Sequence, residues 1–296
     1  MKKIVIFGVG LIGGSVALAL KHNQAALALK KAGFSSHITG VGRTEKSLNE
    51  ALNLGVIDVA ETNVNAAIQH ADLILIAAPV AQTYSILQSI KPHLNKQTVI
   101  TDAGSTKCDV LVCAKAVLGE QFNQFVGGHP IAGAEKSGVS AAKVDLFRHK
   151  NVVLTPATET NIDAIAHVKE LWQACGANVS EMSAENHDSI FAAVSHLPHL
   201  LAFALVDDIA ARPNAAQLFS FAASGFRDFT RIAGSHPEMW RDISLANKSA
   251  LLKELNAYQL ELKQLKQLLE NEDGAGLQAL FERASIARNN WAQNKK

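Results

Sequence analysis

The chain contains 296 residues, of which 48% are hydrophobic and 19% charged, and its formal net charge at pH 7 is +1. This length suits one large domain or two ordinary ones. The near-zero charge argues against a nucleic-acid-binding or membrane-surface protein, because both usually need an excess of basic residues. No uninterrupted apolar run reaches the roughly 18–20 residues of a membrane span. We therefore expect a soluble, cytoplasmic protein whose partners include neither nucleic acid nor membrane.

The first part of the chain alternates short apolar segments with helical patterns. Such patterns predict strands over residues 3–7, 38–41, 71–77, 98–102 and 151–155, with a further one near 178–182, and helices over 11–31, 46–54 and 81–94. Strands that show little polar alternation and are separated by helices are typical of βαβ units. We therefore predict a parallel sheet covered by helices.

The strand patterns stop near residue 183. Helices are predicted beyond it, over residues 186–211, 215–225, 237–270 and 277–293. An apolar stripe recurs at helical spacing and is expected to build a core and a dimer interface: Leu251, Leu255, Leu262, Leu265 and Leu269. The sequence thus predicts an α/β domain over residues 1–182 and an all-α domain over residues 183–296.

The segment Gly8-Val9-Gly10-Leu11-Ile12-Gly13 directly follows the first predicted strand and opens a helix. In this context G-x-G-x-x-G indicates a Rossmann dinucleotide-binding domain. Gly8 allows the tight turn, Gly10 lets the backbone approach a pyrophosphate, and Gly13 allows the helix to pack closely on the strand. The helix start at Leu11 and Ile12 offers unpaired N–H groups to phosphates. A tight turn without a ligand is the alternative.

The residues after the second predicted strand indicate which dinucleotide binds. NAD sites usually place an Asp or Glu there for the ribose 2′-hydroxyl, but this chain has Gly42-Arg43-Thr44. Arg43 can pair with a 2′-phosphate, and Thr44 can donate a hydrogen bond to it. We therefore predict NADP as the cofactor, with NAD possible. The alternative is that Arg43 is only a solvated loop cation.

Polar and glycine-containing segments follow the next strands. Ala78 and Pro79 come after the third predicted strand, and Gly104 and Ser105 come after the next. Open α/β sheets bind ligands beyond the carboxyl ends of their strands, so we expect Ala78, Pro79 and Gly104 to contact the cofactor. His129 stands between glycine and proline, where no helix or strand role explains it. It is either a functional residue or a histidine of a surface loop.

Three polar residues of the helical part share one broad helix face. His187, Ser195 and His199 are separated by multiples of four residues, and Pro198 is expected to kink their helix. This arrangement favours a polar pocket. We predict no metal site, because no carboxylate or cysteine completes the pair of His196 and His199.

Arg227, Asp228 and Arg231 form a charged cluster in the same part of the chain. An arginine is well suited to bind a carboxylate through two parallel hydrogen bonds. A surface array of ion pairs is the alternative.

Taken together, the segments GVGLIGGS, DAGSTK, GGHPIAGAEKSG, HD…SHLPH and GFRDFTRIA…MW resemble the prephenate/arogenate dehydrogenase family of tyrosine biosynthesis. The resemblance covers nearly the whole chain, with the motifs in the same order. It implies a Rossmann domain followed by a helical substrate domain through which two chains dimerise. It also implies oxidative decarboxylation of arogenate, prephenate or both, with hydride transfer to the cofactor.

The resemblance also implies roles for individual residues. His129 would accept the proton of the substrate 4-hydroxyl, Ser105 would hydrogen-bond this centre, and Arg231 would hold a substrate carboxylate. The remaining implied substrate-binding positions are His187, Ser195, His199 and Trp240, with Glu135 and Asp228 in an ionic network at the pocket entrance. Because a carboxylate such as Glu135 would attract an ammonium group, we expect arogenate to be at least one substrate.

Three other functions remain open at this point. One is another NADP-dependent oxidoreductase with a Rossmann-plus-helical layout, such as a β-hydroxyacid dehydrogenase or an imine reductase, although those enzymes typically need a catalytic Lys or Asp where this chain has His187 and His199. The second is a non-catalytic NADP sensor, and the third is a metal-dependent enzyme that uses the histidines.

Overall fold

The computed structural model of the chain describes residues 2–22, 37–133 and 136–293. It divides into two compact units, Met1–Lys248 and Ser249–Lys296. Each unit is described by itself below.

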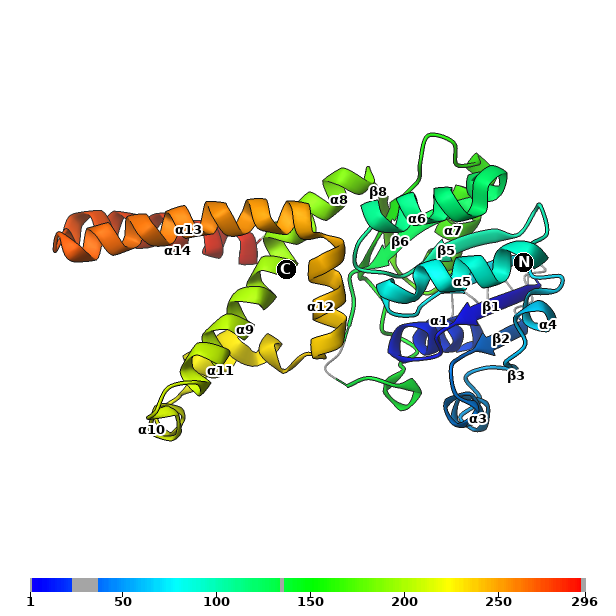
Figure 1. Cartoon of the computed structure of the whole chain (residues 1–296), viewed down its shortest axis with the longest axis horizontal. Coiled ribbons are helices and arrows are strands. Elements are labelled where there is room, and N and C mark those ends of the chain that lie inside the picture. The colour runs from blue at the N-terminus through cyan, green and yellow to red at the C-terminus, as the bar shows by residue number, and fades with distance from the viewer. Residues whose placement is uncertain (1, 23–36, 134–135, 294–296) are drawn as a thin grey trace. The chain divides into compact units, whose positions relative to one another are not determined.

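The first unit is built on one eight-stranded sheet with the order β3-β2-β1-β4-β5-β6-β7-β8 (Figure 1). Neighbouring strands pair in parallel, except for the antiparallel pair β6 and β7. The strands are β1 (Lys3–Phe7), β2 (His37–Val41), β3 (Val59–Glu61), β4 (Leu73–Ile76), β5 (Val99–Asp102), β6 (Phe125–Pro130), β7 (Asn151–Thr155) and β8 (Asn178–Glu181).

Both faces of the sheet are buried, which explains the apolar strands. In β1, Ile4 and Ile6 belong to one hydrophobic cluster, whereas Val5 belongs to the other. Residues of α1 (Leu11–His22), α3 (Glu45–Asn53) and α7 (Ile162–Ala174) complete the first cluster. Residues of α4 (Val64–Ile68), α5 (Thr83–Ile90) and α6 (Cys108–Leu118) complete the second. The predicted α/β class is confirmed.

Two strands, β3 and β6, were not predicted from the sequence. The three-residue strand β3 is too short to give a pattern. Strand β6 contains His129, which the sequence placed in a loop, and its Gly127 and Gly128 resemble loop residues. Both glycines lie against neighbouring strands, because a Cβ at Gly127 would lie 2.4 Å from Thr155 Oγ1 and one at Gly128 would lie 2.8 Å from Asp102 O. Of the helix expected over 11–31, the part after His22 lies outside the described residues.

Helices follow the sheet in the first unit. They are α8 (Ala184–Phe191), α9 (Leu197–Ala210), α10 (Ala215–Ser220), α11 (Ser224–Thr230) and α12 (Pro237–Ala246). A π-helical turn, Ala192–His196, joins α8 to α9 without a break. The irregularity expected at Pro198 therefore lies one turn earlier, in the π-helical turn, and Pro198 follows it as the second residue of α9.

The stretch Ala184–Ala210 is strongly apolar. Its 27 residues include an 18-residue window with a mean hydropathy of 1.7, of which 28% is buried. By length and composition alone this helix could cross a membrane, although the core helix of a soluble protein meets the same criteria. The count of uninterrupted apolar residues in the sequence did not anticipate this, because polar residues break up every run.

The single helix expected over 237–270 is two helices. Helix α12 ends before Asn247, and α13 (Lys248–Glu270) begins after it. Asn247 is 4% exposed, and its side-chain nitrogen donates to the backbone oxygen of Asp188 at 2.8 Å. This long-range hydrogen bond, which is not visible in the periodicity, accompanies the break.

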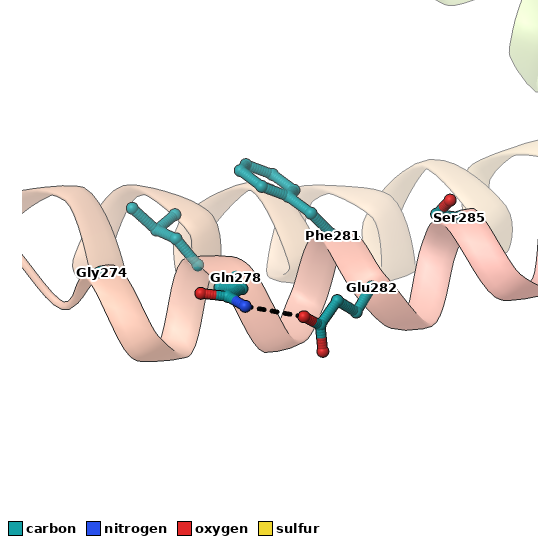
Figure 2. A pocket seen from close by; sticks show the side chains of 6 residues that line it. Gly274, Gln278, Phe281, Glu282 and Ser285 are labelled. Carbon is teal, nitrogen blue, oxygen red and sulfur yellow. Dashed lines mark hydrogen bonds between the residues drawn. The ribbon is translucent and has the colours of Figure 1, made fainter.

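The second unit consists of most of α13 and of α14 (Gly274–Gln293), which overlap in the view of Figure 1. Part of the predicted leucine stripe is exposed in the single chain, together with other large apolar side chains: Leu260, Leu262, Leu269 and Phe281. Figure 2 shows a shallow hollow on α14 beside Phe281, where Gln278 Nε2 donates to Glu282 Oε1 at 2.8 Å. Residues of α14 alone line this hollow, so we assign it no ligand.

We predict that Gly13→Ala destabilises the fold, whereas Gly10→Ala does not. A Cβ at Gly13 would lie 2.2 Å from Gly8 O and 2.8 Å from Ile6 Cγ2, whereas one at Gly10 would have no atom within 4 Å. Overpacking of this kind costs about 1–3 kcal/mol. Urea unfolding of both variants measures the difference in the free energy of unfolding. Equal stability of the Gly13→Ala and wild-type proteins would contradict the close packing of α1 on β1.

Candidate active site

The glycine loop lies at the carboxyl end of β1. Gly8 has a φ of 91°, and its N–H donates to Val41 O at 2.9 Å. A side chain at Gly10 would point into open space. Helix α1 begins with Leu11 and Ile12 and carries no acidic residue in its first turn. An open backbone at the start of a helix is the arrangement that accepts a pyrophosphate, so the loop fits a dinucleotide.

Arg43 and Thr44 follow β2 at the same edge of the sheet, because Phe7 and Val41 pair at the ends of their strands. Both are exposed. Thr44 caps α3, and its Oγ1 accepts a hydrogen bond from Ser47 N at 3.3 Å. Thr44 thus has a structural role in addition to the predicted one, whereas Arg43 offers an exposed cation at this edge.

The turns after β4 and β5 adjoin the glycine loop. Gly8 lies against the backbone of Ala77, from whose oxygen a Cβ at Gly8 would be 2.6 Å away, and Ala78 and Pro79 continue this turn. After β5, a Cβ at Gly104 would lie 2.9 Å from the side chain of Val80. The structure therefore brings the turns that carry the predicted cofactor residues to one edge of the sheet.

A fully buried ion pair stands behind the turn that carries Ser105. The Lys107 ammonium contacts Asp102 Oδ2, and these residues are 0% and 1% exposed. Asp102 also accepts hydrogen bonds from Gly104 N at 2.8 Å and from Gly128 N at 3.0 Å. The carboxylate therefore fixes two segments, the turn that contains Ser105 and the strand residue next to His129.

His129 is half-buried and is linked through hydrogen bonds to two buried residues, His187 and Asp188. Its Nδ1 lies 2.8 Å from His187 Nε2, and His187 Nδ1 lies 2.8 Å from Asp188 Oδ1. Asp188 also accepts hydrogen bonds from Lys107 N at 2.9 Å and Cys108 N at 2.8 Å, at the start of α6. The Phe191 ring packs 4.8 Å from the His129 ring, which limits the freedom of the imidazole.

These contacts set the charge states. Burial holds the pKa of His129 well below its usual value, and His187 and the Lys107 cation lower it further. Burial also lowers the pKa of His187, although Asp188 opposes this. Burial would raise the pKa of Asp188, but hydrogen bonds from His187 and from the backbone of Cys108 and Lys107 outweigh it and keep this pKa below its usual value. At neutral pH, Asp188 is therefore a carboxylate, and the imidazoles of His187 and His129 are both neutral.

The two histidines of the SHLPH segment, His196 and His199, have different surroundings. His196 is 1% exposed and lies 3.1 Å, through Nδ1, from the side-chain nitrogen of Asn247. His199 Nδ1 donates to Ser195 O at 2.9 Å, and its ring stacks on Trp240 with centroids 3.6 Å apart. His199 and Trp240 thus form a stacked pair of rings. His187 is fully buried and lies against His129.

A cavity of about 780 Å³ brings two of the predicted residues together, Arg231 and His199. Lys136 and Lys143 line it from the segment that follows β6. Asp228 is exposed on α11 and does not line this cavity, and the other predicted site residues outside its described lining are Ser105, His129, His187, Ser195 and Trp240. Glu135 lies outside the described residues. Among the residues that the structure describes, no group of His, Cys, Asp or Glu could hold a metal ion.

The sequence interpretation missed the residues that support the site from behind. Asp102 and Lys107 frame the DAGSTK motif, and Asp188 directly follows His187, so each stands within a motif that was noted. Their roles depend on burial and on contacts between distant segments. Asn247 carried no signal in the sequence.

Known proteins resemble the whole chain. The family described as prephenate dehydrogenase, nucleotide-binding domain, matches residues 25–181, and its dimerization domain matches residues 183–283. The prephenate dehydrogenase of Bacillus subtilis is 38% identical, covering 99% of this chain and 77% of its own length. The cyclohexadienyl dehydrogenase of Zymomonas mobilis is 34% identical, covering 97% of this chain and 95% of its own length.

A solved structure is similarly close. The prephenate dehydrogenase of Aquifex aeolicus, in complex with hydroxyphenyl propionate and NAD+, is 37% identical and has a TM-score of 0.88. The similarity covers 97% of this chain and 97% of that one.

We predict that the folded protein loses stability as the pH falls below about 6.5. Burial is the main cause of the lowered pKa of His129, His187, His196 and His199, and it brings that of His196 to about 4. The unfolded chain therefore binds protons that the folded chain excludes. For each such histidine, the free energy of unfolding falls by at most about 1.4 kcal/mol per pH unit.

Urea unfolding between pH 7 and pH 5 measures this slope. Replacing the buried His196 by Gln should reduce the slope by the contribution of one histidine, whereas replacing the exposed His93 by Gln should leave it unchanged. An unfolding free energy that stays constant over this range would contradict the neutral buried histidines.

Proposed function

Because the chain belongs to the prephenate dehydrogenase family, we propose that it oxidatively decarboxylates arogenate, prephenate or both, with hydride transfer to NADP. Prephenate would give 4-hydroxyphenylpyruvate, and arogenate would give tyrosine. The chain is an oxidoreductase of a family that uses a nicotinamide dinucleotide. The choice of substrate and of NADP over NAD is the proposed part.

The observation that carries the proposed activity is the series of hydrogen bonds that joins His129, His187 and Asp188. The reaction requires a group that accepts the proton of the substrate 4-hydroxyl while C4 loses a hydride and C1 loses carbon dioxide. His129 is neutral at physiological pH and so can accept this proton. Ser105 would hydrogen-bond the same hydroxyl from the turn that Asp102 anchors. The bound nicotinamide would accept the hydride.

The cavity residues would bind the substrate carboxylates. Arg231, Lys136 and Lys143 give the described part of the lining three cations, which suits the two carboxylates that prephenate and arogenate share. His199 and the stacked Trp240 would bound the ring of the substrate, with Ser195, Asp228 and Glu135 as further proposed pocket residues. We retain arogenate as at least one substrate, in line with the name cyclohexadienyl dehydrogenase given to the Zymomonas relative.

The residues at the sheet edge support a dinucleotide with a 2′-phosphate. Gly8, Gly10 and Gly13 leave the space and the helix start that a pyrophosphate needs. The exposed cation Arg43 follows β2, and no acidic residue stands between β2 and Thr44. The Aquifex relative holds NAD+, so the preference for NADP rests on Arg43 in this chain.

We also propose a homodimer formed through the helical part. The family match over 183–283 is described as a dimerization domain. Large apolar side chains are exposed there in the single chain, including Leu260, Leu262 and Phe281. The two family matches meet at residues 181 and 183, which supports our division into a cofactor domain over 1–182 and a substrate and dimerisation domain over 183–296.

We predict that the wild-type protein turns over at least one of the two substrates, and that His129→Asn abolishes turnover without loss of cofactor binding. Asparagine cannot accept the proton, whereas the proposed cofactor residues lie in the turns and at the helix start that follow other strands. Assays of both substrates with both cofactors, and titration of protein fluorescence with NADPH, measure these effects. His93→Asn, at an exposed site, is the matched control. Full activity of His129→Asn would remove His129 from the reaction.

We predict that Arg43→Ala raises the Kd for NADP by about 10- to 100-fold while it changes the Kd for NAD by less than about threefold. The lost hydrogen bonds to a phosphate are worth about 1.5–3 kcal/mol. Isothermal titration calorimetry with both dinucleotides measures the ratio. An equal effect on NAD and NADP would show that Arg43 does not contact the 2′-phosphate.

A further inference from the structure

We propose that Asp188 is a positioning residue that acts through His187 to set which nitrogen of His129 carries the proton. This inference rests on the proposed function, in which His129 accepts the substrate proton. Asp188 lies in α8 and is 3% exposed, whereas His129 is half-buried. It therefore has no route to the substrate other than through its neighbours.

The hydrogen-bond partners determine the protonation of each nitrogen in turn. Asp188 keeps a lowered pKa and is a carboxylate, so it can only accept. His187 must then donate from Nδ1 across the 2.8 Å contact, which leaves its Nε2 as an acceptor. His129 must in turn donate from Nδ1 to His187 Nε2, also at 2.8 Å. The Nε2 of His129 is then left without a proton, and it is the atom that can receive one from a substrate hydroxyl.

The same carboxylate anchors the turn that carries Ser105. Lys107 N and Cys108 N, at the end of that turn, both donate to Asp188. Asp102 holds the other end of the turn through Gly104 N. Asp188 therefore connects the proton acceptor with the segment that supplies the proposed hydroxyl partner. A purely structural role would use only the second set of contacts, so the two roles can be separated by experiment.

The substitution Asp188→Asn tests the first role. With its nitrogen in the place of Oδ1, the asparagine donates to His187 Nδ1 and gives up the hydrogen bond from Lys107 N, and this reverses the protonation of His187 and then of His129. His129 Nε2 would carry a proton and could not accept another. We expect kcat to fall by about 100-fold or more, as expected when a catalytic histidine is held in the wrong tautomer. We expect the KM for the substrate and the Kd for NADPH to change by less than about threefold, since a KM effect would signal lost binding.

The substitution His187→Gln separates the two roles. A glutamine oxygen can take the place of His187 Nε2 and accept from His129 Nδ1 without help from Asp188. Adding Asp188→Asn to His187→Gln should therefore lower kcat by less than about tenfold, so the two effects are not additive. If Asp188→Asn lowers kcat by the same factor in both backgrounds, Asp188 acts on the Ser105 turn or on folding alone and the proposal fails.

A spectroscopic measurement tests the proposal without any turnover. In protein labelled with ¹⁵N-histidine, two-bond ¹H–¹⁵N spectra distinguish a protonated from an unprotonated ring nitrogen, and the His129→Asn spectrum assigns the His129 signals. We expect a proton on Nδ1 of His129 in the wild type and on Nε2 in Asp188→Asn. An unchanged tautomer overturns the proposal. Absence of turnover by the wild type would instead overturn the proposed function and leave this result intact.

A matched control comes from the helix turn whose backbone donates to Asp188. Asp109 lies in the first turn of α6 and is partly buried. Its replacement by Asn removes a carboxylate near Cys108 without touching the hydrogen bonds of His187. We expect Asp109→Asn to keep the wild-type tautomer of His129. A change of tautomer in this variant would show that the loss of any nearby charge is sufficient, and the proposal would fail.

Discussion

The buried carboxylate of Asp188 links the helices that follow the sheet to α6, a helix that packs on the sheet. It lies in α8, yet it accepts hydrogen bonds from the backbone at the start of α6 and from the imidazole of His187. A carboxylate without such partners would be costly to bury, whereas three donors and the positive end of a helix dipole compensate for the lost hydration. The position of α8 against α6 is therefore specified by a polar contact as well as by apolar packing.

A second buried carboxylate, that of Asp102, connects segments within the sheet. Asp102 holds Lys107, Gly104 and Gly128, and so connects β5 with β6 directly behind the proposed acceptor. Removing one member of such a pair is more damaging than replacing both, because the remaining charge is buried alone. The two carboxylates bracket the Ser105 turn, which explains why a short glycine-containing loop can hold a defined conformation beside the cofactor edge.

Local features of the structure were predictable from the sequence, and distant contacts were not. The glycine loop was identified because a strand, three glycines and a helix occur within eleven consecutive residues, Lys3–Gly13. The strand β6 was missed because its glycines, which let neighbouring strands approach, have the composition of a loop. His187 was expected at the pocket surface, and its contacts instead place it between His129 and Asp188. Neither the Asp102–Lys107 pair nor the break at Asn247 could be predicted, because both depend on burial created by distant segments.

The π-helical turn at Ala192–His196 has a consequence for how this site could change. Such a turn holds one residue more than the α-helix it interrupts. The wider turn takes up this residue, so the helix on either side keeps the phase of a regular helix that is one residue shorter. In a regular helix, His187 and His199 would lie about 120° apart around the axis, whereas the π-helical turn brings them to nearly the same side. Conversion of this one turn into a regular α-helix of the same length would therefore separate the two side chains, although no functional residue had been altered.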